Sequence, residues 1–269
     1  MNRSRPPEGP AGSSRSWSGR LASVPTTVWV VAGLVVMAQV LTTARYGIFR
    51  DELYYLACAD HLAWGYVDHP PLSIAILAGW TALFGDSVLS LGILPALGAG
   101  VLVLMMSDLA AALGGEDRAR ILASLATGVA PIVLILGGFY SMNILDLLFW
   151  VALVRILVWM VNRSEPRGWL AFGLLGGLGL LNKLSVLFLL TAVALSVVLT
   201  PLRRHLRTPW PWAGAALAFL LVLPHLVWQF HHGWPTLEFV TNARLYKIAY
   251  GGPLPFLGEA ALMVGPPSL

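Results

Sequence analysis

The residues best suited to chemistry lie together in one short stretch, from Phe49 to Ser73. This stretch reads FRDELYYLACADHLAWGYVDHPPLS and contains four carboxylates, two histidines and one arginine, although only 11% of the whole chain is charged. A carboxylate can take a proton from an attacking hydroxyl group, and a cation can stabilise a developing negative charge. The stretch is therefore the first place to look for an active site.

A helix over residues 51–62 would have one polar and one apolar face. The polar face follows the i, i+3, i+4, i+7 spacing and contains Asp51, Tyr54, Tyr55, Cys58 and His61. The opposite face contains Leu53, Leu56 and Ala57, which suits a helix lying on a membrane surface. The prolines of YVDHPPL then end the segment. The aromatic side chains of this stretch are also what a membrane interface alone would favour.

Composition indicates why a membrane is expected. The chain has 269 residues, of which 57% are hydrophobic, and its mean hydropathy is +0.75. Soluble domains are roughly 45–50% apolar. Several apolar segments approach or exceed the roughly 18 residues that a membrane-spanning helix needs. They cover residues 24–44, 87–113, 119–139, 144–161, 168–182, 185–200 and 211–230, and a further one begins near 255.

Basic residues predict how these spans are oriented. They cluster in the N-terminal tail, at Arg118 and Arg120, at Arg163 and Arg167, and at Arg203, Arg204 and Arg207. The positive-inside rule places all four clusters in the cytoplasm, which requires that segment 72–84 does not cross. That segment is also short for a span. We therefore expect an all-α polytopic bundle of about seven spans, with interfacial helices in the first outer loop.

The net charge of +4 is explained by these topology markers, so it does not indicate nucleic-acid binding. Residues 1–23 are polar and rich in Pro, Gly and Ser, which predicts a disordered cytoplasmic tail. A cleaved leader is disfavoured because the tail is long, has no A-x-A site and precedes several spans. The transmembrane domain then covers residues 24–269. The single cysteine, Cys58, leaves the redox compartment open.

The predicted topology places further polar residues on the outer side. Asp51 and Glu52 follow directly after a span, where a carboxylate suggests a polar cavity. Asp146 lies at the start of the fourth span, and Lys183 lies between the fifth span and the sixth span. Each of these two could snorkel to the interface, or the two could form a structural pair. Arg155, inside the fourth span, is interpreted as structural or snorkelling.

Other chemistries find little support. Asp68 with His69, His231 and His232 could be considered for a metal, but their spacing is not that of a ligand set. We therefore expect no cofactor, with a divalent metal as the weaker alternative. His225 is interpreted as a satisfied helix-end histidine. The chain has neither G-x-x-x-x-G-K-[ST] nor G-x-G-x-x-G, so nucleotide-driven chemistry is not indicated.

Five segments in order resemble a known family. They are FRDELYYLACADHLAWGYVDHPPL, GDSVLSLGILPAL, YSMNILDLLFW, GLGLLNKLSVLFL and PHLVWQFHHGWPTLEF. This order resembles the bacterial branch of the dolichyl-phosphate-mannose protein mannosyltransferase superfamily, which includes the lipid A aminoarabinose transferases and has the GT-C fold. The resemblance covers about residues 29 to 259. Its most specific feature is the acidic pair after the first span, followed by H-P-P.

The resemblance implies a glycosyltransferase with a polyprenyl-phosphate sugar donor and an active site on the outer, periplasmic face of the plasma (inner) membrane. It implies a general base matching Asp51, with Glu52 beside it, and a second acidic residue matching Asp146. It places Lys183 near the donor phosphate. Arg50 and Arg45 are further cations on that side. Asp68 and His69 stand where the aminoarabinose transferases carry an acidic–basic pair, with His in place of Lys, so His69 is a further candidate for contact with the donor phosphate.

The residues that we expect to line the substrate are Tyr54, Tyr55, Tyr66, Asp68, Tyr140 and Asn143. The acceptor could be a protein, a glycan or a lipid, and the sugar is left open. Family members are usually longer, so we expect a chain that is incomplete at its C-terminus. The alternatives are an inactive truncated relative acting as a membrane scaffold, and a transporter or lipid flippase. A transporter would place its site at the midplane between repeats, and no repeat is visible.

Overall fold

The computed structural model describes residues 24–246 and 252–265, and within these ranges it contains helices and no strand. The predicted tail of residues 1–23 lies outside the described residues. The helices are α2 (Thr26–Tyr46), α3 (Arg50–Ala59), α4 (Leu72–Phe84), α5 (Val88–Ala112), α6 (Asp117–Val129), α7 (Pro131–Leu136), α8 (Met142–Arg163), α9 (Gly168–Asn182), α10 (Val186–Leu199), the 3-10 helix η1 (Pro201–Arg207), α11 (Trp210–His231), α12 (Pro235–Tyr246) and α13 (Pro253–Val264). The predicted all-α class is confirmed.

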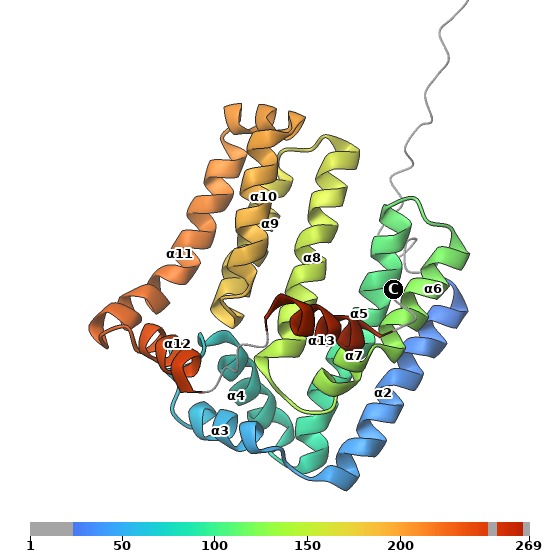
Figure 1. Cartoon of the computed structure of the whole chain (residues 1–269), viewed down its shortest axis with the longest axis vertical. Coiled ribbons are helices and arrows are strands. Elements are labelled where there is room, and N and C mark those ends of the chain that lie inside the picture. Colours follow the sequence, from blue (N-terminus) through green and yellow to red (C-terminus); the bar gives the residue numbers. More distant parts are fainter. Residues whose placement is uncertain (1–23, 247–251, 266–269) are drawn as a thin grey trace, which may run out of the picture.

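The long helices run side by side in two groups. Helices α8 to α11 form one group and α2, α5 and α6 form the other (Figure 1). The packing of α5 on α8 joins them, around a core that includes Ala99 and Ile144. Arg155 of α8 also pairs with Asp108 of α5 across this junction. This pair agrees with the interpretation of Arg155 as a structural residue.

The number of spans is less clear than the number of apolar segments. Every predicted span except 119–139 coincides with one helix, but only four helices in the described part of the chain are long and apolar enough to cross a membrane: α2, α5, α8 and α11. A fifth is reached if α10 and η1, which meet at 96°, count as one span. The segment 119–139 breaks into α6 and α7 because Pro131 cannot continue the hydrogen bonding of α6. The expected count of seven is therefore not confirmed.

The two ends of the bundle carry different residues. The connection between α5 and α6, the connection between α8 and α9, and η1 lie at one end, which is uppermost in Figure 1. These are the segments with the arginine clusters. Helices α3 and α4, the start of α8 and the turn between α9 and α10 lie at the opposite end. The predicted grouping of polar site residues on one face is thus compatible with the arrangement of the helices.

Helices α9 and α11 pack so closely that their contact depends on glycine. A Cβ atom at Gly173 would overlap the backbone of Gly214, and one at Gly214 would overlap the carbonyl of Trp169. Close approach of this kind is typical of helix pairs with small residues at the interface. The apolar sequence GLLGGLGLL of α9 therefore determines how near α11 can come.

We expect Gly173→Ala to destabilise the protein, since the added methyl group has to push two backbones apart. Overpacking of this kind costs about 1–3 kcal/mol. The measurement is the thermal unfolding midpoint in detergent. Gly33→Ala is the matched control, because a Cβ at this exposed position of α2 would meet nothing within 4 Å. A Gly173→Ala midpoint equal to that of Gly33→Ala would contradict the predicted backbone contact.

Candidate active site

The acidic pair predicted to be catalytic lies in the first turn of α3. Acidic side chains are favoured there by the partial positive charge of the helix N-terminus. The Asp51 side chain is 45% exposed, and its Oδ1 lies 3.1 Å from Nε of the exposed Arg50. Asp51 is thus open to an incoming group. Helix α3 ends at Ala59 rather than at residue 62, so His61 does not extend its polar face as predicted.

The early end of α3 has a local cause. The hydroxyl group of Tyr66 folds back over the segment that follows the helix. It accepts a hydrogen bond from the backbone N–H of Ala63, and lies 3.1 and 3.2 Å from the carbonyl oxygens of Cys58 and His61. The chain therefore turns after Ala59 instead of continuing as a helix. Tyr66, predicted to line the substrate, is here a half-buried residue that closes a loop.

Glu52 has a different environment from its neighbour. It is 4% exposed, and both of its carboxylate oxygens accept backbone hydrogen bonds. Oε2 accepts from the N–H of Phe49 at 2.8 Å, which is the glutamate half of a capping box at the start of α3. Oε1 accepts from the N–H of Tyr140 at 2.7 Å, 88 residues away in the sequence. The predicted catalytic pair is therefore divided into one open and one enclosed carboxylate.

Asp68 and His69 lie beside α3. Asp68 Oδ1 accepts a hydrogen bond of 2.8 Å from the Tyr54 hydroxyl, and His69 Nε2 lies 3.6 Å from the same oxygen. The His69 ring is fully buried, stacks on Tyr55 at 4.9 Å and also contacts Tyr66. Burial lowers the pKa of His69, and its Nδ1 donates to the carbonyl of Pro70. A phosphate could reach this neutral ring only if the ring moved, so phosphate contact at His69 stays a prediction.

A second cluster lies where α8 begins and where α9 gives way to α10. Lys183 Nζ donates to Asn143 Oδ1 at 2.6 Å and lies 3.8 Å from Asp146 Oδ2. The Ser185 hydroxyl lies 2.8 and 2.7 Å from the two oxygens of Asp146. Asp146 is buried, whereas the Lys183 side chain is 32% exposed. The structure thus forms the Asp146–Lys183 pair that the sequence left as one alternative.

The segment 140–143 joins the two clusters. Besides the N–H of Tyr140 on Glu52, the N–H of Met142 donates to the Tyr55 hydroxyl at 3.4 Å. The carbonyl of Met142 accepts from Asn182 Nδ2 at 2.9 Å. Tyr140 is fully buried, and its hydroxyl donates to the Ser73 carbonyl at 2.6 Å. Three segments far apart in the sequence, 49–73, 139–146 and 182–185, therefore form one hydrogen-bonded unit.

Several predicted residues have structural neighbours that sequence reasoning did not assign. Asn182 and Ser185 flank Lys183 and hold the segment on both sides of it, and the polar run N-K-L-S between two apolar helices was the available signal.

Arg50 is exposed beside Asp51, and Arg45 is exposed at the end of α2. Burial raises the pKa of Tyr55 to about 12, so this hydroxyl keeps its proton at neutral pH.

His225 of α11 connects the segment between α3 and α4 to the helical bundle. Its Nδ1 donates to the carbonyl of Trp64 at 2.8 Å, and the adjoining Gly65 packs so tightly on His225 and Trp228 that a Cβ would not fit. The interpretation of His225 as a satisfied helix-end residue agrees with this contact. Within residues 24–246 and 252–265, no three His, Cys, Asp or Glu side chains gather in a way that could hold a metal ion.

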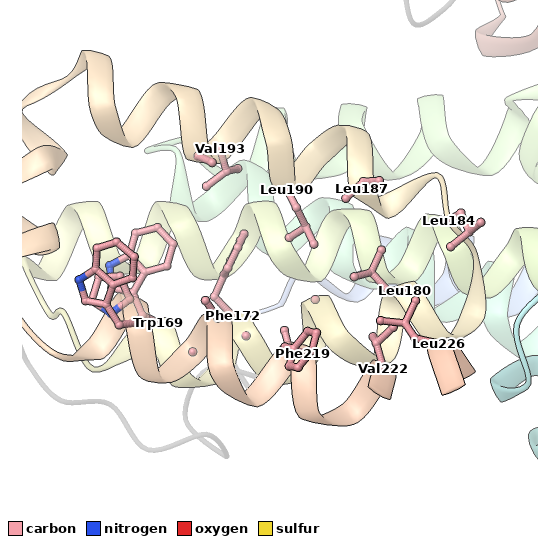
Figure 2. A pocket seen from close by; sticks show the side chains of 18 of the residues that line it. Trp169, Phe172, Leu180, Leu184, Leu187, Leu190, Val193, Phe219, Val222 and Leu226 are labelled. Carbon is pink, nitrogen blue, oxygen red and sulfur yellow. The ribbon is translucent and has the colours of Figure 1, made fainter. Parts of the chain in front are cut away.

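An apolar groove of about 770 Å³ runs between α9, α10 and α11 (Figure 2). Leu184, at one of its ends, directly follows Lys183 in the sequence. The groove continues past Leu187 and Leu190 to Val193 and Trp169. Its lining is almost wholly aliphatic and aromatic, and Gly173, Gly176 and Ala215 widen it. An elongated apolar chain with a charged end fits this combination of groove and lysine.

Comparison with known families identifies the family of the chain. The family model of the dolichyl-phosphate-mannose-protein mannosyltransferases matches residues 68–228, which is more than half of the chain. The chain belongs to this mannosyltransferase family. The matched region includes Asp68, Asp146, Lys183, helices α9 and α10 and most of α11, whereas Asp51 and Glu52 precede it. The family resemblance drawn from the sequence motifs is confirmed.

Two curated relatives of the family are similar to the chain. The lipid A galacturonosyltransferase RgtD of Rhizobium johnstonii is 27% identical over 82% of the chain and 45% of its own length. Undecaprenyl phosphate-alpha-4-amino-4-deoxy-L-arabinose arabinosyl transferase 1 of Pseudomonas fluorescens is 26% identical over 59% of the chain and 30% of its own length. The chain thus spans less than half the length of these two relatives. No solved structure matches it.

Proposed function

We propose that the protein is a membrane glycosyltransferase which moves a sugar from a polyprenyl-phosphate donor to a hydroxyl group of an acceptor on the outer face of the membrane. Family membership supports the glycosyltransferase class. The names of the two relatives support a lipid-linked donor and a lipid acceptor, since one names an undecaprenyl-phosphate sugar and the other names lipid A. Sugar and acceptor for this chain are left to experiment.

The observation that carries the proposal is the Lys183–Asp146 pair, which stands one residue before Leu184, a lining residue at one end of the apolar groove. An ammonium group has three N–H donors. One bonds Asn143 and a second faces Asp146, so the third can bind a phosphate oxygen. The lipid tail attached to that phosphate would lie in the groove, where burial of apolar surface favours it. The two parts of a polyprenyl phosphate would thus have separate binding places, with the phosphate at Lys183 and the apolar tail in the groove.

The reaction needs a base and a stabilised leaving group. The acceptor hydroxyl would lose its proton to Asp51 as its oxygen attacks the anomeric carbon of the sugar. The bond between that carbon and the phosphate oxygen breaks, and the electron pair leaves with the polyprenyl phosphate. Lys183 would balance the negative charge that develops there. The carboxylates near the sugar would favour an oxocarbenium-like transition state, by analogy with glycosidases.

The proposed function is tested with the full chain reconstituted in vesicles. Radiolabelled undecaprenyl-phosphate galacturonic acid and undecaprenyl-phosphate aminoarabinose are offered with lipid A, and label leaving the polyprenyl lipid is followed. Transfer to the acceptor is the expected result. Movement of intact labelled donor between leaflets without transfer would instead support a flippase. If the label stays on the polyprenyl lipid and the labelled donor stays in its original leaflet, the result would favour the scaffold alternative.

The groove makes a separate prediction about the donor. Ala194 of α10 lines the groove, whereas the exposed Ala192 of the same helix does not. We expect Ala194→Trp to raise the KM for the polyprenyl donor about tenfold, because the indole ring occupies the space of the tail, and to leave kcat within about twofold. Ala192→Trp should leave both constants unchanged. Equal KM values for the two variants would mean that the tail does not lie in this groove.

A further inference from the structure

Glu52 is adjacent in sequence to the proposed base, yet its surroundings are those of a structural carboxylate. It is 4% exposed, and each oxygen accepts a short backbone hydrogen bond, one from Phe49 and one from Tyr140. A general base must lie within hydrogen-bond reach of the proton that it takes. An acceptor hydroxyl cannot approach Glu52 while these two amides and the surrounding chain enclose it. Glu52 therefore does not serve as an alternative base in this arrangement.

The two amides that Glu52 binds belong to the two halves of the candidate active site. The N–H of Phe49 precedes α3 and so fixes the turn that carries Asp51. The N–H of Tyr140 lies in the segment that leads into α8, which carries Asn143 and Asp146. A contact between the rings of Phe49 and Phe139, with centroids 4.6 Å apart, lies at the same junction. The carboxylate thus spans the junction between the base and the lysine cluster.

We propose that Glu52 is a positioning residue, which holds Asp51 at a fixed place relative to the Lys183–Asp146 cluster. This inference rests on the proposed function for its catalytic consequence. The reason lies in the geometry of transfer. The base acts on the acceptor oxygen that attacks the anomeric carbon, and the cation acts on the phosphate oxygen that leaves the same carbon. A misplacement of about 1 Å can cost about 100-fold in rate. Hydrogen bonds to a charged acceptor are also stronger than neutral ones, which suits a carboxylate at such a junction.

Glu52→Gln is the decisive substitution because it keeps size and removes one acceptor. The amide group of glutamine can accept only through its oxygen, so one of the two backbone N–H groups would face an NH₂ group instead. We expect kcat to fall about 10- to 100-fold while the KM for the donor changes less than about threefold. The acidic limb of the pH–kcat profile should stay where it is in the wild type, because the base is unchanged.

A structural readout makes the test independent of activity. Spin labels at Leu53 of α3 and Val161 of α8, both exposed, report the distance between the two halves in a background with the buried Cys58 replaced by Ser. We expect one narrow distance distribution for the wild type and for Asp60→Asn, which removes an exposed carboxylate just after α3. Glu52→Gln should give a broader or shifted distribution. If this variant does not accumulate in the membrane, Glu52→Asp, which keeps the charge but is one methylene shorter, should show the same changes.

Three results would overturn the inference. One is a Glu52→Gln distance distribution identical to that of Asp60→Asn. Another is a broadened distribution with unchanged kcat, which would remove the link to catalysis. The third is loss of the acidic limb in Glu52→Gln while Asp51→Asn retains it, which would make Glu52 the base. Absence of transfer by the wild type would instead count against the proposed function, and the distance measurement would still decide whether Glu52 joins the two halves.

Discussion

Asp51→Asn is expected to reduce the kcat of sugar transfer by about 10²–10⁴-fold and to leave the KM for the donor nearly unchanged. The asparagine amide keeps the size of the side chain but cannot accept the proton of the acceptor hydroxyl, and general base catalysis typically contributes a factor of this size. The structure leaves Asp51 suited to this role because its side chain is 45% exposed at the start of α3. The measurement is transfer of radiolabel at saturating donor, normalised to the amount of protein in the membrane.

The matched control for Asp51 is Asp60→Asn. Asp60 is an exposed carboxylate at the other end of the same helix, so its removal changes the local charge equally without affecting the proposed base. We expect it to retain wild-type transfer. Asp51→Glu should recover part of the activity, since the carboxylate returns with its oxygens displaced by one methylene group. Equal kcat values for Asp51→Asn and Asp60→Asn would rule out Asp51 as the base.

The arrangement of helices was largely predictable because its signals are local. Apolar runs located α2, α5, α8 and α11, and the short segment 72–84 was recognised as too short to span, as the 13 residues of α4 show. Pro131 lay inside one predicted span, and its effect on the helix was available from the sequence alone. The length of each apolar run predicts a helix. The number of helices that cross a membrane also depends on whether short helices such as α9 span it.

The candidate site was predictable in its residue types but not in its division of roles. Asp51 and Glu52 are adjacent in sequence and chemically alike, and the contact that encloses Glu52 against the rest of the fold comes from the N–H of Tyr140, 88 residues away. The same holds for Asp146 and Lys183, whose pairing depends on the turn between α9 and α10. Contacts of this kind arise from packing between distant segments, which a periodicity along the chain does not encode.

Lys183→Met is expected to lower kcat/KM by at least about 100-fold, an effect second in size to that of Asp51→Asn. The substitution keeps an unbranched side chain of similar length and removes the positive charge that would stabilise the departing phosphate. Removal of one preorganised group that stabilises transition-state charge typically costs about 10²–10³-fold in kcat. Undecaprenyl phosphate without a sugar should also inhibit the variant more weakly than the wild type, because the lost contact is with the phosphate. Lys183→Arg should retain more activity than Lys183→Met, since the positive charge remains.

A purely structural role of Lys183 makes a different prediction, because its ammonium lies 3.8 Å from the buried Asp146. If Lys183 acted only by holding Asp146 in place, loss of the hydroxyl that contacts both Asp146 oxygens should have a similar effect. Ser185→Ala tests this, since it removes that hydroxyl and leaves the lysine. We expect Ser185→Ala to lose less than about tenfold in kcat/KM and to keep normal inhibition by undecaprenyl phosphate. Matching losses in Ser185→Ala and Lys183→Met would show that the lysine supports Asp146 rather than the phosphate, and the donor site would then have to lie elsewhere.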